Sequence, residues 1–177
     1  PAKIVSLIFS DVPGNDLSVI ASGPTVRDDT TVSDALAVYK KYHLENLGLL
    51  ESDFLETLKD DNLLKNVDNL LILSNLTALR AMEEKARKLG FEVKIYSDRL
   101  KGEAEAIGKL LLQNAVKNSI LLAGGETTVK VTGNGQGGRN QELVLGALLY
   151  LDGKTTIASF DSDGWDNCKF AGAIGDF

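Results

Sequence analysis

The chain is poor in cysteine, histidine and aromatic residues, and these shortages exclude several kinds of site. Its 177 residues include one cysteine, Cys168, and one histidine, His43. Neither an intrachain disulfide nor a cysteine-based zinc site is therefore possible. His43 lies in a polar region with spaced leucines, which is typical of a surface residue rather than a catalytic base. No apolar run has membrane-spanning length and no signal peptide is visible, so we expect a cytoplasmic protein with no membrane partner.

Positive charge is also scarce. There are 19 Lys and Arg residues against 25 Asp and Glu, a formal net charge of −6. The basic residues are scattered along the chain rather than clustered, which argues against nucleic acid as a partner. The balance of 44% hydrophobic and 25% charged residues is that of an ordinary globular protein. We therefore expect neither nucleic acid nor an anionic membrane as the main partner.

Strand and helix patterns alternate over the first two-thirds of the chain. Apolar runs predict strands over 4–9, 69–73, 91–96, 120–123 and 155–160. Helical spacing predicts helices over 32–42, 51–58, 78–89, 104–116 and 143–151. Residues 69–96 have the pattern of a βαβ unit with a parallel strand pair. The alternation predicts an α/β fold with a mostly parallel, Rossmann-like sheet, followed by a second α/β domain.

The alternation of predicted strands and helices changes near Lys117 and Asn118. We therefore expect part of one domain over 1–118 and part of a second domain over 119–177. Both ends of the chain are typical of a truncated sequence, because a predicted buried strand begins almost at the first residue and apolar, glycine-rich residues continue to the last. We expect a fragment whose partner is the remainder of the same polypeptide.

A glycine-rich stretch separates the apolar run 120–123 from a predicted helix. It begins with Gly124-Gly125-Glu126-Thr127, continues with an alternating segment at 129–131 that is typical of a half-buried strand, and ends with four glycines before Arg139. Glycine allows close approach of the backbone to a ligand, and a helix start offers unpaired N–H groups. With Arg139 beside it, this stretch is a candidate anion-binding corner.

A simple turn is the alternative interpretation of the same glycines. No Lys-Ser/Thr pair follows them, so the stretch is not a P-loop. Gly133, Gly135 and Gly138 have the spacing of a dinucleotide-binding loop, but no acidic residue follows at the required distance.

Acidic residues follow two of the predicted strands. Asp11 comes after the first strand, at the strand end where ligands bind in open α/β sheets. Asp161, Asp163 and Asp166 follow the last strand. Such carboxylates suit Mg²⁺, or one of them could accept a proton from an attacking hydroxyl group. The alternative is a turn whose aspartates cap a helix that begins near Cys168.

Three motifs together resemble the glycerate 2-kinase family of the DUF4147 and MOFRL type, formerly named hydroxypyruvate reductases. Residues 10–25 resemble its SDVPGD…SVIASGPT signature. Residues 124–129 and 137–142 resemble the GGETTV…GGRNQE hallmark of its MOFRL domain. Residues 163–174 resemble the TDGxDG…AGAI segment of that domain. The motifs stand in the order of the family.

The resemblance implies ATP-dependent phosphorylation of D-glycerate to 2-phosphoglycerate with Mg²⁺, in a cleft between two domains. It implies catalytic roles for Arg139, Asp163 and Asp166, with the two aspartates as metal ligands, and we give Asp161 less weight because glycine is common at its position. The other implied residues bind nucleotide (Gly124, Gly125, Glu126, Thr127, Gly137 and Gly138) or substrate (Asp11, Asn75, Asn140 and Glu142).

The chain also departs from the family pattern. The family's GKA-type lysine, GGGSA run and TGPTGTNV-like segment have no counterpart here, and residues 167–170 differ from the usual glycine-proline-threonine stretch. The missing lysine favours a non-catalytic nucleotide or sugar-acid binding module for the isolated chain, which we expect to be inactive as a kinase. An NAD(P)H-dependent hydroxypyruvate reductase is a further alternative, disfavoured by the missing acidic residue.

Overall fold

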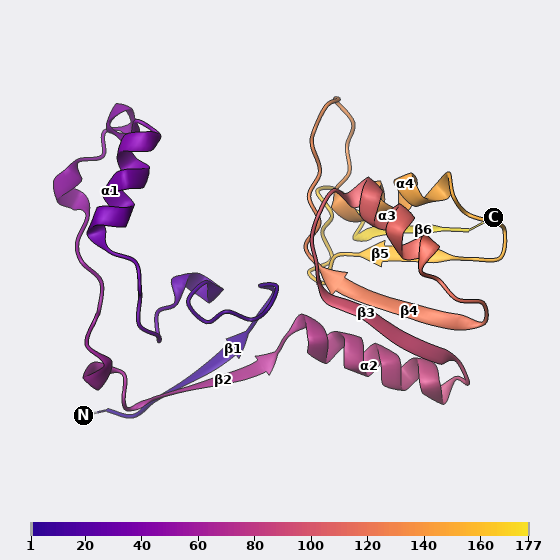
Figure 1. The fold of residues 1–177 in the computed structure, drawn as a ribbon, viewed down its shortest axis with the longest axis horizontal. Coiled ribbons are helices and arrows are strands. Elements are labelled where there is room, and N and C mark those ends of the chain that lie inside the picture. Colours follow the sequence, from indigo (N-terminus) through magenta and orange to yellow (C-terminus); the bar gives the residue numbers. More distant parts are fainter. Residues whose placement is uncertain (1, 177) are drawn as a thin grey trace. The chain divides into compact units, whose positions relative to one another are not determined.

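The computed structural model describes residues 2–176, which form two compact units that meet in sequence between Leu73 and Ser74. Each unit mixes helices with a pair of parallel strands, so the predicted α/β class is confirmed (Figure 1). The domain division expected after Asn118 differs from this contact-based division and stays a prediction. No helix within 2–176 is both long and apolar enough to cross a bilayer.

The first unit is built on strand β1 (Ile4–Phe9), which pairs in parallel with β2 (Val67–Leu73). Helix α1 (Val32–Lys41) lies between them in sequence. It begins with a capping box, in which Thr31 and Asp34 each bond the other's backbone N–H. These elements confirm the strands predicted over 4–9 and 69–73 and the helix predicted over 32–42.

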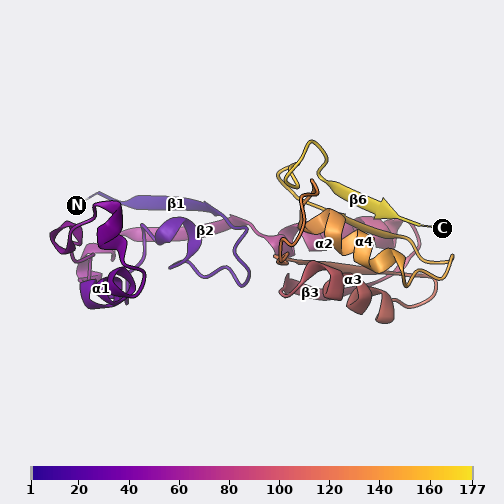
Figure 2. The same ribbon diagram turned by 90° about the horizontal axis from the view of Figure 1, so that it is seen from above.

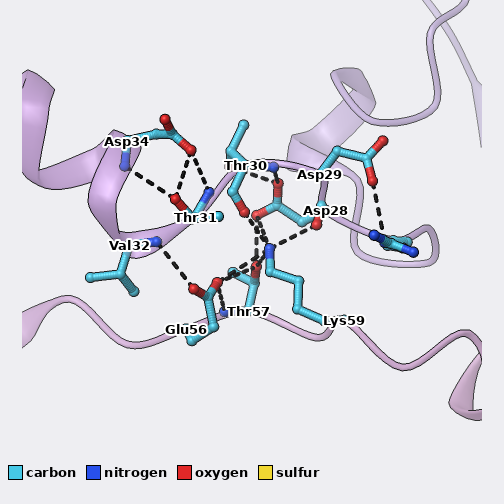
Figure 3. A network of polar contacts seen from close by, with 10 residues as sticks. Asp28, Asp29, Thr30, Thr31, Val32, Asp34, Glu56, Thr57 and Lys59 are labelled. Atoms are coloured by element: carbon cyan, nitrogen blue, oxygen red, sulfur yellow. Dashed lines mark hydrogen bonds and ion pairs between the residues drawn. The ribbon is translucent and has the colours of Figure 1, made fainter.

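The helix predicted over 51–58 is wrong, because only Glu51–Asp53 forms a short 3₁₀ turn. Side chains of the following segment instead bond the segment before α1 (Figure 3). Lys59 Nζ donates to the carbonyl oxygens of Asp28, at 2.7 Å, and Thr30, while Glu56 accepts from the N–H of Val32 at 3.2 Å. These tertiary hydrogen bonds outweigh the small intrinsic helix preference of so short a stretch.

The second unit is built on β3 (Glu92–Leu100), which pairs in parallel with β4 (Ser119–Gly125). Helix α2 (Asn75–Lys88) lies against both strands, and α3 (Ala104–Gln113) connects them. Helix α4 (Arg139–Leu148) packs on α3 and on an antiparallel pair, β5 (Ile157–Phe160) and β6 (Gly172–Gly175) (Figures 1 and 2). The main core joins these elements through Leu100, Ala104, Ile107, Leu143, Val144, Ala147 and Ile157.

The parallel pairing predicted for strands 69–73 and 91–96 would join the two separate units and stays a prediction. In the described part of the chain β2 takes β1 as its hydrogen-bonded neighbour and β3 takes β4. Within the second unit β3, α3 and β4 form a parallel βαβ connection. Apolar runs locate strands along the chain, but the neighbour of each strand depends on packing that a local pattern does not contain.

The half-buried strand predicted over 129–131 is also absent. Residues 129–137 have no regular structure, and Val131 is 83% exposed. One isolated bridge joins Thr128 to Glu103, just before this segment. Alternation alone does not make a strand where the backbone N–H and C=O groups have no neighbouring strand to bond.

Two glycines allow α3 and α4 to cross closely. A Cβ atom on Gly108 of α3 would lie 2.2 Å from the carbonyl oxygen of Leu143, and one on Gly146 of α4 would lie 2.5 Å from Cγ of Glu105. A side chain at either position would force the backbone or a neighbouring side chain to move. The close crossing of α3 and α4 therefore requires glycine at both positions.

We expect Gly108→Ala to lower the free energy of unfolding by about 1–3 kcal/mol, because overpacking forces the helices apart. The sign is informative, since the same change in an open helix raises stability by about 0.5–1 kcal/mol. Urea unfolding measures the effect. Gly133→Ala is the control, because nothing lies within 4 Å of its Cβ position; equal effects at both sites would contradict the close crossing.

Candidate active site around the start of α4

A buried carboxylate occupies the N-terminus of α4. Asp166 is 2% exposed. Its oxygens accept hydrogen bonds from the backbone N–H groups of Asn140 at 3.1 Å and Gln141 at 2.9 Å. The side-chain amides of the same residues donate at 3.2 and 3.1 Å. The N–H groups that we expected to face a ligand are therefore used within the protein.

This arrangement keeps Asp166 ionised. Burial alone would raise the pKa of its carboxyl, but the hydrogen bonds from Gln141 and Asn140 outweigh burial and lower the pKa below the ordinary value. The positive end of the helix dipole acts in the same direction. The carboxylate requires glycine beneath it, because a Cβ atom on Gly138 would lie 2.3 Å from Asp166 Oδ1.

The capping interpretation of the acidic loop thus holds for Asp166, although the helix it caps is α4 rather than one near Cys168. Residues 168–171 form no helix. Asp163 differs from Asp166 in being exposed, and its Oδ1 accepts only the nearby N–H of Trp165, at 2.7 Å, among the described contacts.

The fit of this loop to Mg²⁺ follows from those contacts. Asp166 does not fit a metal site, because amide N–H groups already surround its carboxylate. Asp163 fits as a single exposed ligand. Over residues 2–176 no group of three or more His, Cys, Asp or Glu side chains is arranged to hold a metal ion.

Arg139, the first residue of α4, lies between two carboxylates from other elements. Its Nη1 lies 2.7 Å from Oε1 of Glu126, which follows β4. Its Nη2 lies 3.6 Å from Oδ2 of Asp161, which follows β5. Partial burial would lower the pKa of the guanidinium, but the bond to Glu126 and the charge of both acids raise it. The structure therefore places Asp161 next to the Arg139 guanidinium, although the sequence made Asp161 the weakest candidate among the three aspartates.

The glycine pair at the end of β4 permits close packing. A Cβ atom on Gly124 would lie 2.2 Å from Oδ1 of Asn75, and one on Gly125, at φ +150°, would lie 2.1 Å from the backbone nitrogen of Leu100. Asn75 donates to the carbonyl oxygen of Asp98 at 2.8 Å. Thr127 is buried just beyond the pair. Asn75, Gly124 and Gly125 thus lie together in the second unit.

The remaining predicted residues divide between the two units. Asn140 accepts from Ser159 Oγ at 2.6 Å, Glu142 lies half-buried in the first turn of α4, and Gly137 precedes the helix at φ +140°. Asp11 is an exposed residue of the first unit. No role was predicted for Gln141, whose Nε2 contacts both Asp166 and Cys168. Its position in the GGRNQE motif is the sequence feature that could have identified it as a site residue.

Comparisons with known proteins agree with the motifs. The model of a domain of unknown function, DUF4147, matches residues 1–52, and the MOFRL family model matches residues 119–177. Glycerate 2-kinase of Pyrococcus horikoshii is 39% identical over 92% of this chain and 41% of that protein. A putative hydroxypyruvate reductase of Agrobacterium vitis is 38% identical over 97% of this chain and 48% of that protein.

A solved structure is similar as well. The crystal structure of glycerate kinase from Thermotoga maritima superposes with a TM-score of 0.85 at 38% identity, over 99% of this chain and 45% of that chain. The present chain spans less than half the length of each of these relatives.

We expect Asp166→Asn to lower the free energy of unfolding by about 2 kcal/mol, the upper range for losing a helix cap, because an amide NH₂ would face the N–H groups of α4. Asp163→Asn is the matched control and should change stability by less than about 0.5 kcal/mol. Thermal and urea unfolding of both variants measure this. If the two variants were equally stable, Asp166 would not stabilise the start of α4.

The lowered pKa of Asp166 also predicts a pH dependence. The folded pKa lies below the unfolded value of about 3.9. The stabilisation is therefore complete above that pH and is lost as the pH falls through the folded pKa. The stability difference between the wild-type chain and Asp166→Asn should shrink from pH 6 toward about pH 3. A constant difference over this range would show that the charge of Asp166 is not involved.

Proposed function

The chain belongs to the glycerate 2-kinase family, and on this premise we propose that it forms part of an enzyme that phosphorylates D-glycerate. ATP with its Mg²⁺ would be the phosphoryl donor and 2-phosphoglycerate the product. Family membership carries the proposal, since two family models match and relatives named glycerate 2-kinase align over almost the whole chain.

The geometry around Arg139 supports this chemistry. Phosphoryl transfer depends mainly on positioning and on cations that stabilise the negative charge of the phosphoryl oxygens. Arg139 stays charged and is 38% exposed, so an anion can reach it. Glu126 orients its guanidinium, and Asp166 fixes the helix end from which it projects. Asp163 is available to bind the Mg²⁺ that accompanies ATP, or to accept the proton of the attacking hydroxyl.

The reductase alternative fits the structure less well, although one relative carries that name. Dinucleotide enzymes place the pyrophosphate on the backbone N–H groups at a helix N-terminus that follows a tight glycine turn. At α4 the N–H groups of Asn140 and Gln141 bond Asp166. The glycines at 133 and 135 lie in a segment without regular structure rather than in a tight strand-to-helix turn.

Two assays on purified protein test the proposal. ADP release with ATP and D-glycerate reports the kinase, and NADH oxidation with hydroxypyruvate reports the reductase. Both are run on the present chain and on the complete gene product. We expect ADP release from the complete product and none from the present chain. NADH oxidation without ADP release would replace the kinase by the reductase.

In the active protein, Arg139→Lys should lower turnover by roughly 10²-fold, the effect of losing one oriented donor to the transition state. The melting temperature should change little. Arg80→Lys is the control, because Arg80 lies on α2 and pairs with Glu83 at 2.8 Å. Steady-state kinetics measure the turnover of the two variants. If turnover is unchanged in Arg139→Lys, the role of Arg139 is structural only.

Asp163→Asn should raise the Mg²⁺ concentration for half-maximal activity at least tenfold, about 1.4 kcal/mol, if Asp163 binds the metal. A proton-accepting role would instead lower turnover at saturating Mg²⁺. Mg²⁺ titrations of the wild-type protein and the variant separate these roles. If neither quantity changes, Asp163 takes no part in the reaction.

A further inference from the structure

We propose that the Asp161 carboxylate is an internal competitor for Arg139, which weakens the binding of phosphate and carboxylate ligands to that guanidinium. The inference rests on the proposed function, because it assigns oxyanions as the ligands of Arg139. It adds a residue that sets the affinity of the site.

The two acidic neighbours of Arg139 differ in their contact. Glu126 lies at 2.7 Å, the length of a strong charge-assisted hydrogen bond. Asp161 lies at 3.6 Å, which is too long for a hydrogen bond but close enough for electrostatic attraction. An arginine side chain carries five N–H donors. The edge of Arg139 that faces Asp161 can therefore form a shorter bond to an oxygen that approaches it.

The charges in this cluster oppose an approaching anion. One guanidinium and two carboxylates give the cluster a net charge of −1. Asp161 is 22% exposed, less than the 51% of Glu126, so water screens its charge less. An anion at Arg139 must overcome repulsion from Asp161 and give up the attraction between the two side chains.

The backbone holds Asp161 at this position. Its N–H donates to the carbonyl oxygen of Ala171 at 2.7 Å, and its own carbonyl oxygen accepts from the N–H of Gly164 at 3.2 Å. The nearby helix N-terminus offers an anion no substitute for Arg139, because Asp166 accepts from its N–H groups. The affinity for an oxyanion here therefore depends on Arg139 and on the charge of Asp161.

The test measures binding of inorganic phosphate to the whole chain without turnover. Phenylglyoxal modifies arginine, and mass spectrometry of the peptide with Arg139 gives its modification rate at each phosphate concentration. Asp161→Asn removes the charge at constant volume, and Asp161→Ser is a second variant should the first not fold. Asp152→Asn removes an equal charge from an exposed position of the same unit, and Arg99, paired with Asp98 at 3.0 Å, is an internal control peptide.

We expect Asp161→Asn to lower the phosphate concentration for half-protection of Arg139 by about tenfold, and Asp152→Asn to change it less than twofold. Protection at Arg99 should be the same in every variant. Equal effects of the two substitutions, an unchanged or higher concentration in Asp161→Asn, or no protection of Arg139 in any variant would overturn the inference. Failure of the kinase assay with the expected protection would overturn the proposed reaction alone.

Discussion

The buried carboxylate of Asp166 determines how the candidate site is built. It joins the segment between β5 and β6 to the first turn of α4, and backbone and side-chain N–H groups of Asn140 and Gln141 surround it. A buried charge is stable only when such donors replace the water it has lost. The same contact requires Gly138 and fixes the residue from which the Arg139 side chain projects.

This contact changes which group recognises an anion. A glycine-rich stretch before a helix suggests binding by backbone N–H groups, but a carboxylate of the protein itself uses those groups here. The positive charge that remains available belongs to the side chain of Arg139, which is 38% exposed. A guanidinium suits phosphate and carboxylate groups, whereas a closed helix end does not suit the pyrophosphate of a dinucleotide. The start of α4 therefore offers an anion the side chain of Arg139 rather than backbone N–H groups.

The first unit shows the same use of side chains to hold irregular backbone. Thr25, at the end of the SGPT motif, and Asn69 of β2 bond each other twice, at 2.6 and 3.1 Å. Before Thr25, Ala21, Ser22 and Gly23 all have left-handed backbone conformations. Such conformations are costly for residues other than glycine and persist where surrounding contacts enforce them. Lys59 performs a similar role for the segment that leads into α1, where hydrogen bonds from Thr30 and Thr57 lower the pKa of Asp28 to about 2.

The sequence by itself determined the fold class, the family and the position of most helices and strands. Residues with strong local patterns, such as Ile4–Phe9 and the capped helix α1, form the predicted elements because their signals lie within one turn or one strand. The burial expected for the first strand is not observed in this chain, where Leu7 and Phe9 are more than 60% exposed. The tertiary structure decided which strands pair, that residues 129–131 form no strand, and that α4 begins at Arg139 rather than at Leu143. It also separated the two predicted metal ligands, by burying Asp166 and leaving Asp163 exposed, and it brought Asp161 to Arg139. These outcomes depend on contacts between residues more than 20 positions apart along the chain, which no local pattern specifies.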